Sequence, residues 1–202
     1  MSVKKINPRI AVLLLMIIAA AAMRIPNAAQ LTPWAGYTPV GAMALFGGAY
    51  FSNRWKAFGF PLLTLFISDL VINNVVFGGR FGIMHGGWYI MYGVFILVVF
   101  FGKWIIRKVS FTNVILASIV AAVSHWLIMD FAVWIGGGRD LRTMTPLTRD
   151  LPGLLQCYAQ GFPFMKSFLI GNLVYSAILF GGFELAQQRF PVLKFRQPEA
   201  VL

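Results

Sequence analysis

The stretch NVILASIVAAVSHWLIMDFAVWI, residues 113–135, decides the fold class predicted for this chain. It is long enough to cross the hydrocarbon core of a bilayer, which takes about 20 apolar residues in a helix. His125 and Asp130 lie inside it, and a charged side chain at a bilayer centre costs about 2.5 to 3.5 kcal/mol on insertion scales. Because such side chains face protein or water, we interpret the segment as a wall of a membrane-embedded cavity or interface.

One face of this predicted helix carries small residues. Ser118, Ala122 and His125 are spaced three and four residues apart, so they share a face. Small side chains on that face allow another helix to approach closely. Asp130 lies nearer the outer end of the same helix.

The composition of the whole chain is also that of a membrane protein. Of the 202 residues, 59% are hydrophobic and 11% are charged, and the mean hydropathy is +0.77. The net charge is +11, but the basic residues form small clusters at the ends of apolar runs, as membrane orientation signals do. They form no stripe that would follow a phosphate backbone, so nucleic-acid binding is not expected. The single cysteine, Cys157, excludes an intramolecular disulfide.

Six apolar runs predict an all-α transmembrane bundle that forms one integral membrane domain over residues 1–202. The approximate spans are residues 10–25, 38–52, 57–77, 88–106, 113–136 and 162–186, and the outer loops are residues 26–37, 78–87 and 137–161. Most of the 17 basic residues fall at the inner ends, which predicts cytoplasmic termini and a multi-pass protein of the bacterial inner membrane. The first run also fits a signal peptide, with a cleavage site between Ala19 and Ala22.

Two segments of this map are unusual. The second run, residues 40–51, is too short for an ordinary span. Gly41, Ala44 and Gly48 give it a small-residue face suited to packing against another helix. The third outer loop, residues 137–161, is long for a compact protein, and such loops are lids, binding elements or disordered. We expect a lid.

The motifs of common catalytic sites are missing from the sequence. There is no Walker A loop, no GxSxG elbow, no HExxH and no Cys/His metal cluster. We therefore expect no enzymatic activity, no cofactor and no metal site. His85 lies in a glycine-rich loop, where we expect it to be solvated or to cap a turn.

The remaining polar and aromatic residues indicate a pocket that opens outward. Ligand pockets combine apolar walls with a few fixed polar groups, and the outer loops are marked by glycine, proline, arginine and aromatic residues. Each residue also fits a simpler role, as an interfacial aromatic, a loop charge or, for Asp69, a structural hydrogen-bond acceptor. The candidate polar contacts are Asp69, His125, Asp130 and Asn172, and the candidate aromatic walls are Trp34, Trp134 and Tyr158.

Several motifs resemble an uncharacterised family of small bacterial membrane proteins. They are TPVGAMALFGGAYFSNRW (residues 38–55), the Ser68-Asp69 pair, FAVW (residues 131–134), and CYAQGFPF with GNLVYSAILFGG (within residues 157–182). That family is similar to the S components of energy-coupling factor transporters, six-helix subunits that capture vitamins and related micronutrients. The resemblance implies a substrate pocket near the outer face, covered by the first and third outer loops. It also implies a partner, a membrane coupling subunit with two ATPases.

The chain departs from the family pattern at two positions. Met129-Asp130 stands where we expect Ser-Asn, and Gly171-Asn172 stands where we expect Gly-Asp. Asp therefore replaces Asn on one helix, and Asn replaces Asp on the adjacent helix. This reciprocal exchange fits two side chains that hydrogen-bond each other, so we hypothesise a hydrogen bond between Asp130 and Asn172. The small-residue face by which S components dock the coupling subunit is not recognisable in the first helix.

The sequence thus supports two hypotheses about function. The first is a substrate-binding membrane subunit for uptake of a small, vitamin-like solute. Cys157 lies in or near the predicted lid, where a thiolate is suited to a metal-containing solute such as a corrinoid, although a lone cysteine is typically inert. The alternative is a structural or accessory protein that binds another membrane subunit and transports nothing. An enclosed outward pocket distinguishes the first hypothesis from the second.

Overall fold

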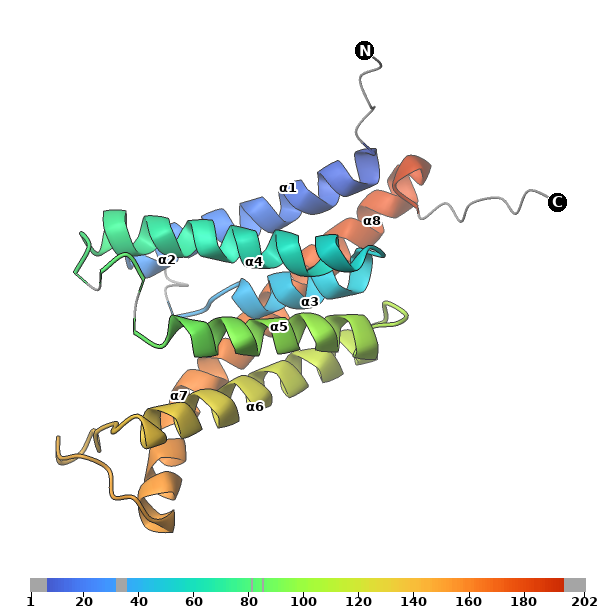
Figure 1. Ribbon diagram of the computed structural model, residues 1–202. Coiled ribbons are helices and arrows are strands. Elements are labelled where there is room, and N and C mark those ends of the chain that lie inside the picture. The colour runs from blue at the N-terminus through green and yellow to red at the C-terminus, as the bar shows by residue number, and fades with distance from the viewer. Residues whose placement is uncertain (1–6, 32–35, 81, 85, 195–202) are drawn as a thin grey trace.

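The computed structural model describes residues 7–31, 36–80, 82–84 and 86–194, and over these ranges it is helical, without β-strands (Figure 1). The predicted all-α fold class is therefore confirmed. The α-helices are α1 (Pro8–Ala22), α2 (Arg24–Ala28), α3 (Val40–Tyr50), α4 (Arg54–Val71), α5 (Trp88–Ile105), α6 (Phe111–Ile135), α7 (Leu151–Ser176) and α8 (Gly182–Arg189). Two π-helical turns, η1 (Ile72–Val76) and η2 (Ala177–Gly181), extend α4 and α7, and η3 (Pro191–Leu193) is a 3-10 turn.

Helices long and apolar enough to cross a membrane make up most of the described chain. There are 5 of them, namely Pro8–Ala28, Arg54–Val76, Trp88–Ile105, Phe111–Ile135 and Leu151–Arg189. Many apolar side chains on their outer surfaces are exposed, among them Leu15, Phe100 and Ile178. This is the distribution that lipid contact produces, because a lipid-facing helix surface stays apolar.

Helix α3 is the short second run, and it lies at the centre of the bundle (Figure 1). It has 11 residues, nearly all of them buried, and it packs against α1, α4, α5, α6 and α7. At about 1.5 Å per residue it covers only about half of a bilayer core of about 30 Å. A helix that is apolar all round is expected inside a bundle, where each face meets another helix.

The glycines of α3 permit this burial, as their spacing predicts. A Cβ atom on Gly48 would meet the backbone carbonyl oxygen of Val99 in α5. In the opposite direction, a Cβ atom on Gly102 of α5 would meet the backbone of Leu45. The two helices therefore touch backbone to backbone, which only small residues allow.

The last helix begins earlier than predicted. Asp150 accepts a hydrogen bond from the backbone N–H of Gly153 at 2.9 Å, and Pro152 stands in the first turn, where its missing N–H costs nothing. Helical structure then continues from Leu151 to Arg189. The predicted outer loop over residues 137–161 is wrong for its second half, because an apolar segment with a good N-cap folds as helix despite its glycines.

The segment that remains between α6 and α7 is held against the bundle. Gln160 of α7 donates to the carbonyl oxygen of Arg139 at 2.9 Å and accepts from the N–H of Leu141 at 3.1 Å. Arg149 donates to the carbonyl oxygen of Ile135 at 2.6 Å. These bonds fix the segment at both ends, and its role as a lid stays a prediction.

The first and last helices meet at one end of the bundle (Figure 1). Arg9, in the first turn of α1, donates to Gln187 Oε1 of α8 at 2.9 Å and to the carbonyl oxygen of Leu193 at 2.5 Å. The ends of the described chain therefore lie on the same side. That this side is cytoplasmic stays a prediction from the basic residues.

Candidate functional site

A buried ion pair joins three helices at the end of the bundle opposite Arg9. Asp69 of α4 is 4% exposed, and its Oδ1 lies 2.6 Å from Arg24 Nη2 at the start of α2. Its Oδ2 accepts a hydrogen bond from the Tyr92 hydroxyl of α5 at 2.8 Å. Arg24 also donates to the Ser68 hydroxyl and, at 3.3 Å, to the carbonyl oxygen of Leu65. Both charges are therefore well bonded within the protein.

The local sequence explains how Arg24 reaches Asp69. Helix α1 ends at Ala22, and the chain turns at Met23 directly into α2, so the side chain at position 24 leaves the apolar run just where α4 ends. The sequence alone did not identify Arg24 as the partner of Asp69. The available signal was the buried acid itself, since an ionised carboxylate inside a span requires a donor.

A cleft of about 260 Å³ opens beside this ion pair, and we call it the Asp69 cleft. Helix α2, the segment at residues 37–38, the end of α4, η1 and α5 all contribute walls. Its polar side chains come from Arg24, Asn27, Tyr37, Thr38, Asp69 and Asn73, and its apolar ones from Ala28, Ile72, Phe77 and Met91. The cleft therefore has the mixture of apolar wall and few polar groups that suits a small solute.

Asn27 builds the back of the Asp69 cleft. Its Nδ2 donates to the carbonyl oxygen of Tyr37 at 2.9 Å and lies 3.1 Å from the Tyr175 hydroxyl of α7. These bonds attach α2 to the segment before α3 and to the last long helix. One wall of the cleft is thus fixed by a side chain that is itself 4% exposed.

Asn73 is the polar group of the cleft that the protein leaves unsatisfied. It is 4% exposed, and its Nδ2 has no hydrogen-bond partner among the residues that the structure describes. It stands on η1, and π-helical turns occur frequently at functional sites. A buried donor without a partner costs about 1 to 3 kcal/mol, so this amide favours an acceptor supplied from outside the chain.

Asn172 lies deeper, between α7 and the first turn of α3. A Cβ atom on Gly41 would overlap its amide, and Gly171 similarly faces the backbone of Thr38. Asn172 is fully buried, and neither amide atom has a hydrogen-bond partner within the described ranges. The same holds for the Ser176 hydroxyl one turn further along α7. This polar group adjoins the cleft wall at Thr38 but does not line the cleft.

The hypothesised hydrogen bond between Asp130 and Asn172 is wrong. The Asn172 amide has no partner within the described residues, and the Asp130 carboxylate instead fills the space left by the missing side chain of Gly161. Gly161 and Asn172 are about 16 Å apart along α7 at about 1.5 Å per residue. Asp130 and Asn172 therefore belong to two separate contacts, the first with Gly161 and the second with Gly41.

Asp130, Cys157, Tyr158 and Trp134 lie where α6 meets α7 and the connection before it. The Cys157 thiol is fully buried and donates to the carbonyl oxygen of Asp130 at 3.3 Å. The Tyr158 hydroxyl donates to the carbonyl oxygen of Leu127 at 3.2 Å, and Trp134 Nε1 donates to that of Thr148 at 2.9 Å. These side chains link neighbouring segments, and none of them lines the Asp69 cleft.

The other two candidates lie elsewhere. His125 stacks on Phe168 of α7 with ring centroids 4.5 Å apart, and Phe95 of α5 completes the cluster, 5.9 Å from His125 and 6.3 Å from Phe168. Trp34 lies outside the described residues, as does His85. Among the candidates that the structure describes, Asp69 alone lines the cleft, so these residues are not gathered into one pocket. No group of three His, Cys, Asp or Glu side chains suited to a metal ion occurs in the described ranges.

Comparison with known proteins places the chain in a family. The profile of a family of unknown function, DUF6580, matches residues 4–193. The chain belongs to the DUF6580 family. No curated protein and no solved structure matches it. None of these comparisons links this DUF6580 member to S components, so that resemblance stays an expectation from the sequence motifs.

Proposed function

We propose that this DUF6580 protein is a substrate-binding membrane subunit that takes up a small polar solute in the Asp69 cleft. The observation that carries the proposal is the unsatisfied, buried amide of Asn73 in the wall of a polar cleft. A cleft of about 260 Å³ lies just below the usual range of about 300 to 1,000 Å³ for ligand pockets, which favours a small solute.

The charges of the cleft favour a neutral solute. Arg24 and Asp69 neutralise each other, and both are held by further hydrogen bonds from within the protein. The groups that remain available to bond a ligand are amides, hydroxyls and backbone atoms. A charged solute would enter without a counter-charge, and burying an unpaired ion is costly.

The resemblance to S components extends the proposal to the transport complex. The protein would lie in the bacterial inner membrane with both termini in the cytoplasm, so that the Asp69 cleft faces outward. It would have no catalytic activity of its own, and a coupling subunit with two ATPases would supply the energy. A vitamin-like compound with amide or carbonyl acceptors matches the Asn73 donor.

The accessory alternative requires a small-residue face that is free to bind another subunit. In the structure, the small-residue face of α3 is already covered by α5. Gly48 and Gly102 are buried in the contact between α3 and α5 and cannot bind another subunit. Solute binding therefore accounts for more of the observations, because it explains both the cleft and the unsatisfied amide within it.

The test is native mass spectrometry of the full chain purified gently in its lipids. The critical variant is Asn73→Leu, which removes the unsatisfied amide without breaking a hydrogen bond to the described protein. The matched control is Asn74→Leu, because Asn74 is exposed, lies outside the cleft and bonds only locally to the carbonyl oxygen of Leu70.

We expect a stoichiometric small molecule on the wild type and on Asn74→Leu, and its loss from Asn73→Leu. Equal retention by both variants would contradict the cleft as the binding site. A stable protein partner with no small molecule, under conditions that preserve the solutes of other transporters, would support the accessory alternative.

A further inference from the structure

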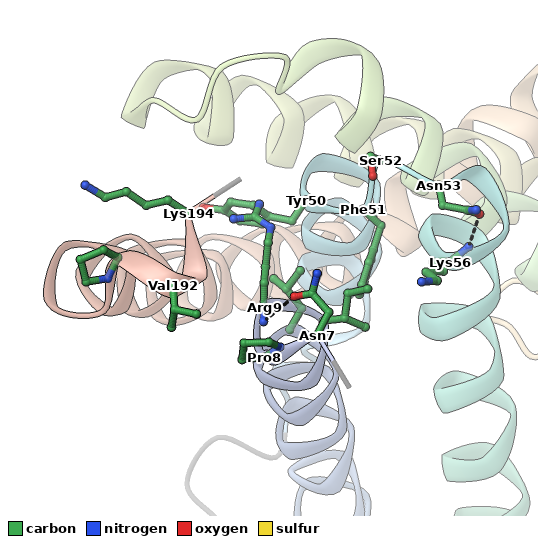
Figure 2. Close-up of a pocket in the computed structure, with 13 residues that line it drawn as sticks. Asn7, Pro8, Arg9, Tyr50, Phe51, Ser52, Asn53, Lys56, Val192 and Lys194 are labelled. Atoms are coloured by element: carbon green, nitrogen blue, oxygen red, sulfur yellow. Dashed lines mark hydrogen bonds between the residues drawn. The ribbon is translucent and has the colours of Figure 1, made fainter. Parts of the chain in front are cut away.

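A second cavity, of about 710 Å³, lies at the opposite end of the bundle from the Asp69 cleft (Figure 2). It is bounded by the start of α1, the end of α3, the start of α4 and the η3 segment. We call it the basic cavity, because Arg9, Lys56 and Lys194 are among its lining residues and none of the described residues that line it is acidic. The proposed function makes no use of it.

Arg9 is fixed in the wall of the basic cavity. Besides its hydrogen bonds to Gln187 and Leu193, its guanidinium lies over the rings of Tyr50 at 5.7 Å and Phe183 at 5.2 Å. Glu184, the acid on this side, accepts the Tyr50 hydroxyl at 2.5 Å. The positive group is therefore held in place rather than mobile in solvent.

The two lysines stand on opposite sides of the opening. Figure 2 shows Lys56 with Asn53 on the α4 side and Lys194 beside Arg9 on the η3 side, with its chain extending outward from the rim. Neither ammonium forms an ion pair with the residues that the structure describes. Flexible lysine side chains at a rim can turn toward an anion that enters.

The backbone adds to the positive potential of the basic cavity. Asn7 and Asn53, which cap α1 and α4, both line it, so the positive ends of two long helices point toward it. Neither helix has an acidic residue in its first turn, and basic residues stand there instead. This arrangement is electrostatically unfavourable on its own. Membrane orientation explains basic residues at this end, but not their convergence on one cavity.

The apolar part of the lining identifies the kind of anion. Ile10, Leu13 and Val192 contribute to the walls, and the face of α1 that carries Ile10 continues through the half-buried Leu14 to the exposed Ile18. We infer that the basic cavity binds the phosphate group of an anionic phospholipid, whose acyl chains follow the apolar surface of α1. Free phosphate shares the charge of the headgroup but has nothing to place on the apolar wall.

The test measures lipid binding to the delipidated full chain in a neutral detergent. The probes are phosphatidylglycerol, phosphatidylcholine and inorganic phosphate, and the readouts are adducts in native mass spectra and the Tm. The critical variant is Lys56→Gln with Lys194→Gln. Its matched control is Lys103→Gln with Lys108→Gln, which removes two charges from the chain near this end but outside the cavity.

We expect one tightly bound phosphatidylglycerol per chain, a raised Tm, and little effect of phosphatidylcholine. At about 1 kcal/mol per lysine near an anionic surface, the critical variant should bind phosphatidylglycerol about 30-fold more weakly, with the control unchanged. An equal loss in the control, or equal binding of both lipids, would overturn the inference. Inorganic phosphate that raises the Tm alone and displaces the lipid would overturn the lipid assignment. Because Asn73 is distant from this site, Asn73→Leu should leave lipid binding intact, so either proposal can fail without the other.

Discussion

Arg24 Nη2 lies 2.6 Å from Asp69 Oδ1, and this contact joins the start of α2 to α4 across a sequence separation of 45 residues. It sets one wall of the Asp69 cleft and holds the first two transmembrane segments together. The partners are 13% and 5% exposed, so solvent screens the pair little. A pair of this kind makes the polar cleft possible inside an otherwise apolar bundle.

Breaking this ion pair from one side should destabilise the protein strongly. We expect Arg24→Met or Asp69→Leu each to cost about 3 to 5 kcal/mol, because each leaves a buried charge without its counter-charge. The double variant should recover most of the loss. Thermal unfolding in detergent measures all three, and Arg142→Gln, which removes an exposed pair with Asp140, is the control with no expected change. Additive losses in the double variant would rule out the coupling.

Gly41 and Asn172 should show compensating substitutions. Gly41→Ala places a Cβ atom inside the Asn172 amide and should cost about 1 to 3 kcal/mol through overpacking. Asn172→Ala in the same chain removes the obstacle and two unsatisfied atoms, so it should restore stability. The control is Gly93→Ala in α5, where nothing lies within 4 Å and the better helix propensity of alanine should stabilise by about 0.5 to 1 kcal/mol.

Gly102→Ala should be more damaging than Gly41→Ala. The new methyl group would meet the backbone of Leu45, which cannot rotate away as a side chain can. We expect separation of α3 from α5 and poor recovery of folded protein, read as the monodisperse fraction in size-exclusion chromatography. A Gly102→Ala protein as stable as the wild type would show that these helices do not touch as described.

Cys157 should be protected from thiol reagents. Its side chain is fully buried and bonded to the carbonyl oxygen of Asp130, so a maleimide should label it only after unfolding. Leu155→Cys, combined with Cys157→Ser, provides the exposed comparison, because Leu155 is 58% exposed. Labelling followed by mass spectrometry makes the measurement. Rapid labelling of native Cys157 would return it to the group of possible solute contacts.

Asp150 should make the start of α7 sensitive to acid. Hydrogen bonds from Thr148 and from the backbone N–H of Gly153 lower the pKa of Asp150 below its usual value. A lowered pKa in the folded state means that the contribution is complete above the ordinary value of about 3.9 and is lost as pH falls through the folded value. Asp150→Ala should therefore reduce the Tm at pH 7, and the difference from the wild type should vanish in acid. Asp150→Ser, which caps without a charge, should behave alike at both pH values.

The hydropathy of single segments was sufficient to locate most of the helices. Residues 88–106 and 113–136 were expected as spans, and α5 and α6 occupy Trp88–Ile105 and Phe111–Ile135. The apolar length of a segment is a local property, and in a membrane a helix must satisfy its own backbone hydrogen bonds, so the sequence alone decides such elements. The central, buried position of α3 could not be predicted in the same way, because a short apolar run is compatible with several arrangements.

Local reasoning was wrong where neighbouring segments decide the outcome. Glycine and proline in residues 151–161 indicated a loop. In the structure, however, Gly161 leaves room for Asp130 and Gly153 leaves room for Thr148, so these glycines allow close packing of a helix. The candidate site was also only partly predictable. Asp69 was identified as a buried acid, whereas Asn73 was not singled out, since an exposed and a buried asparagine look the same in a sequence.

The sequence by itself determined that this is an all-helical chain with membrane-spanning segments, because hydrophobic length and charge position act one segment at a time. Only the tertiary structure decided that Arg24 is the partner of Asp69, that Asp130 and Asn172 lie apart, and that Asn73 faces a cleft. The physical reason is that these relationships depend on how the helices cross. The crossing is set by many small contacts, such as that between Gly48 and Val99, summed over the whole bundle.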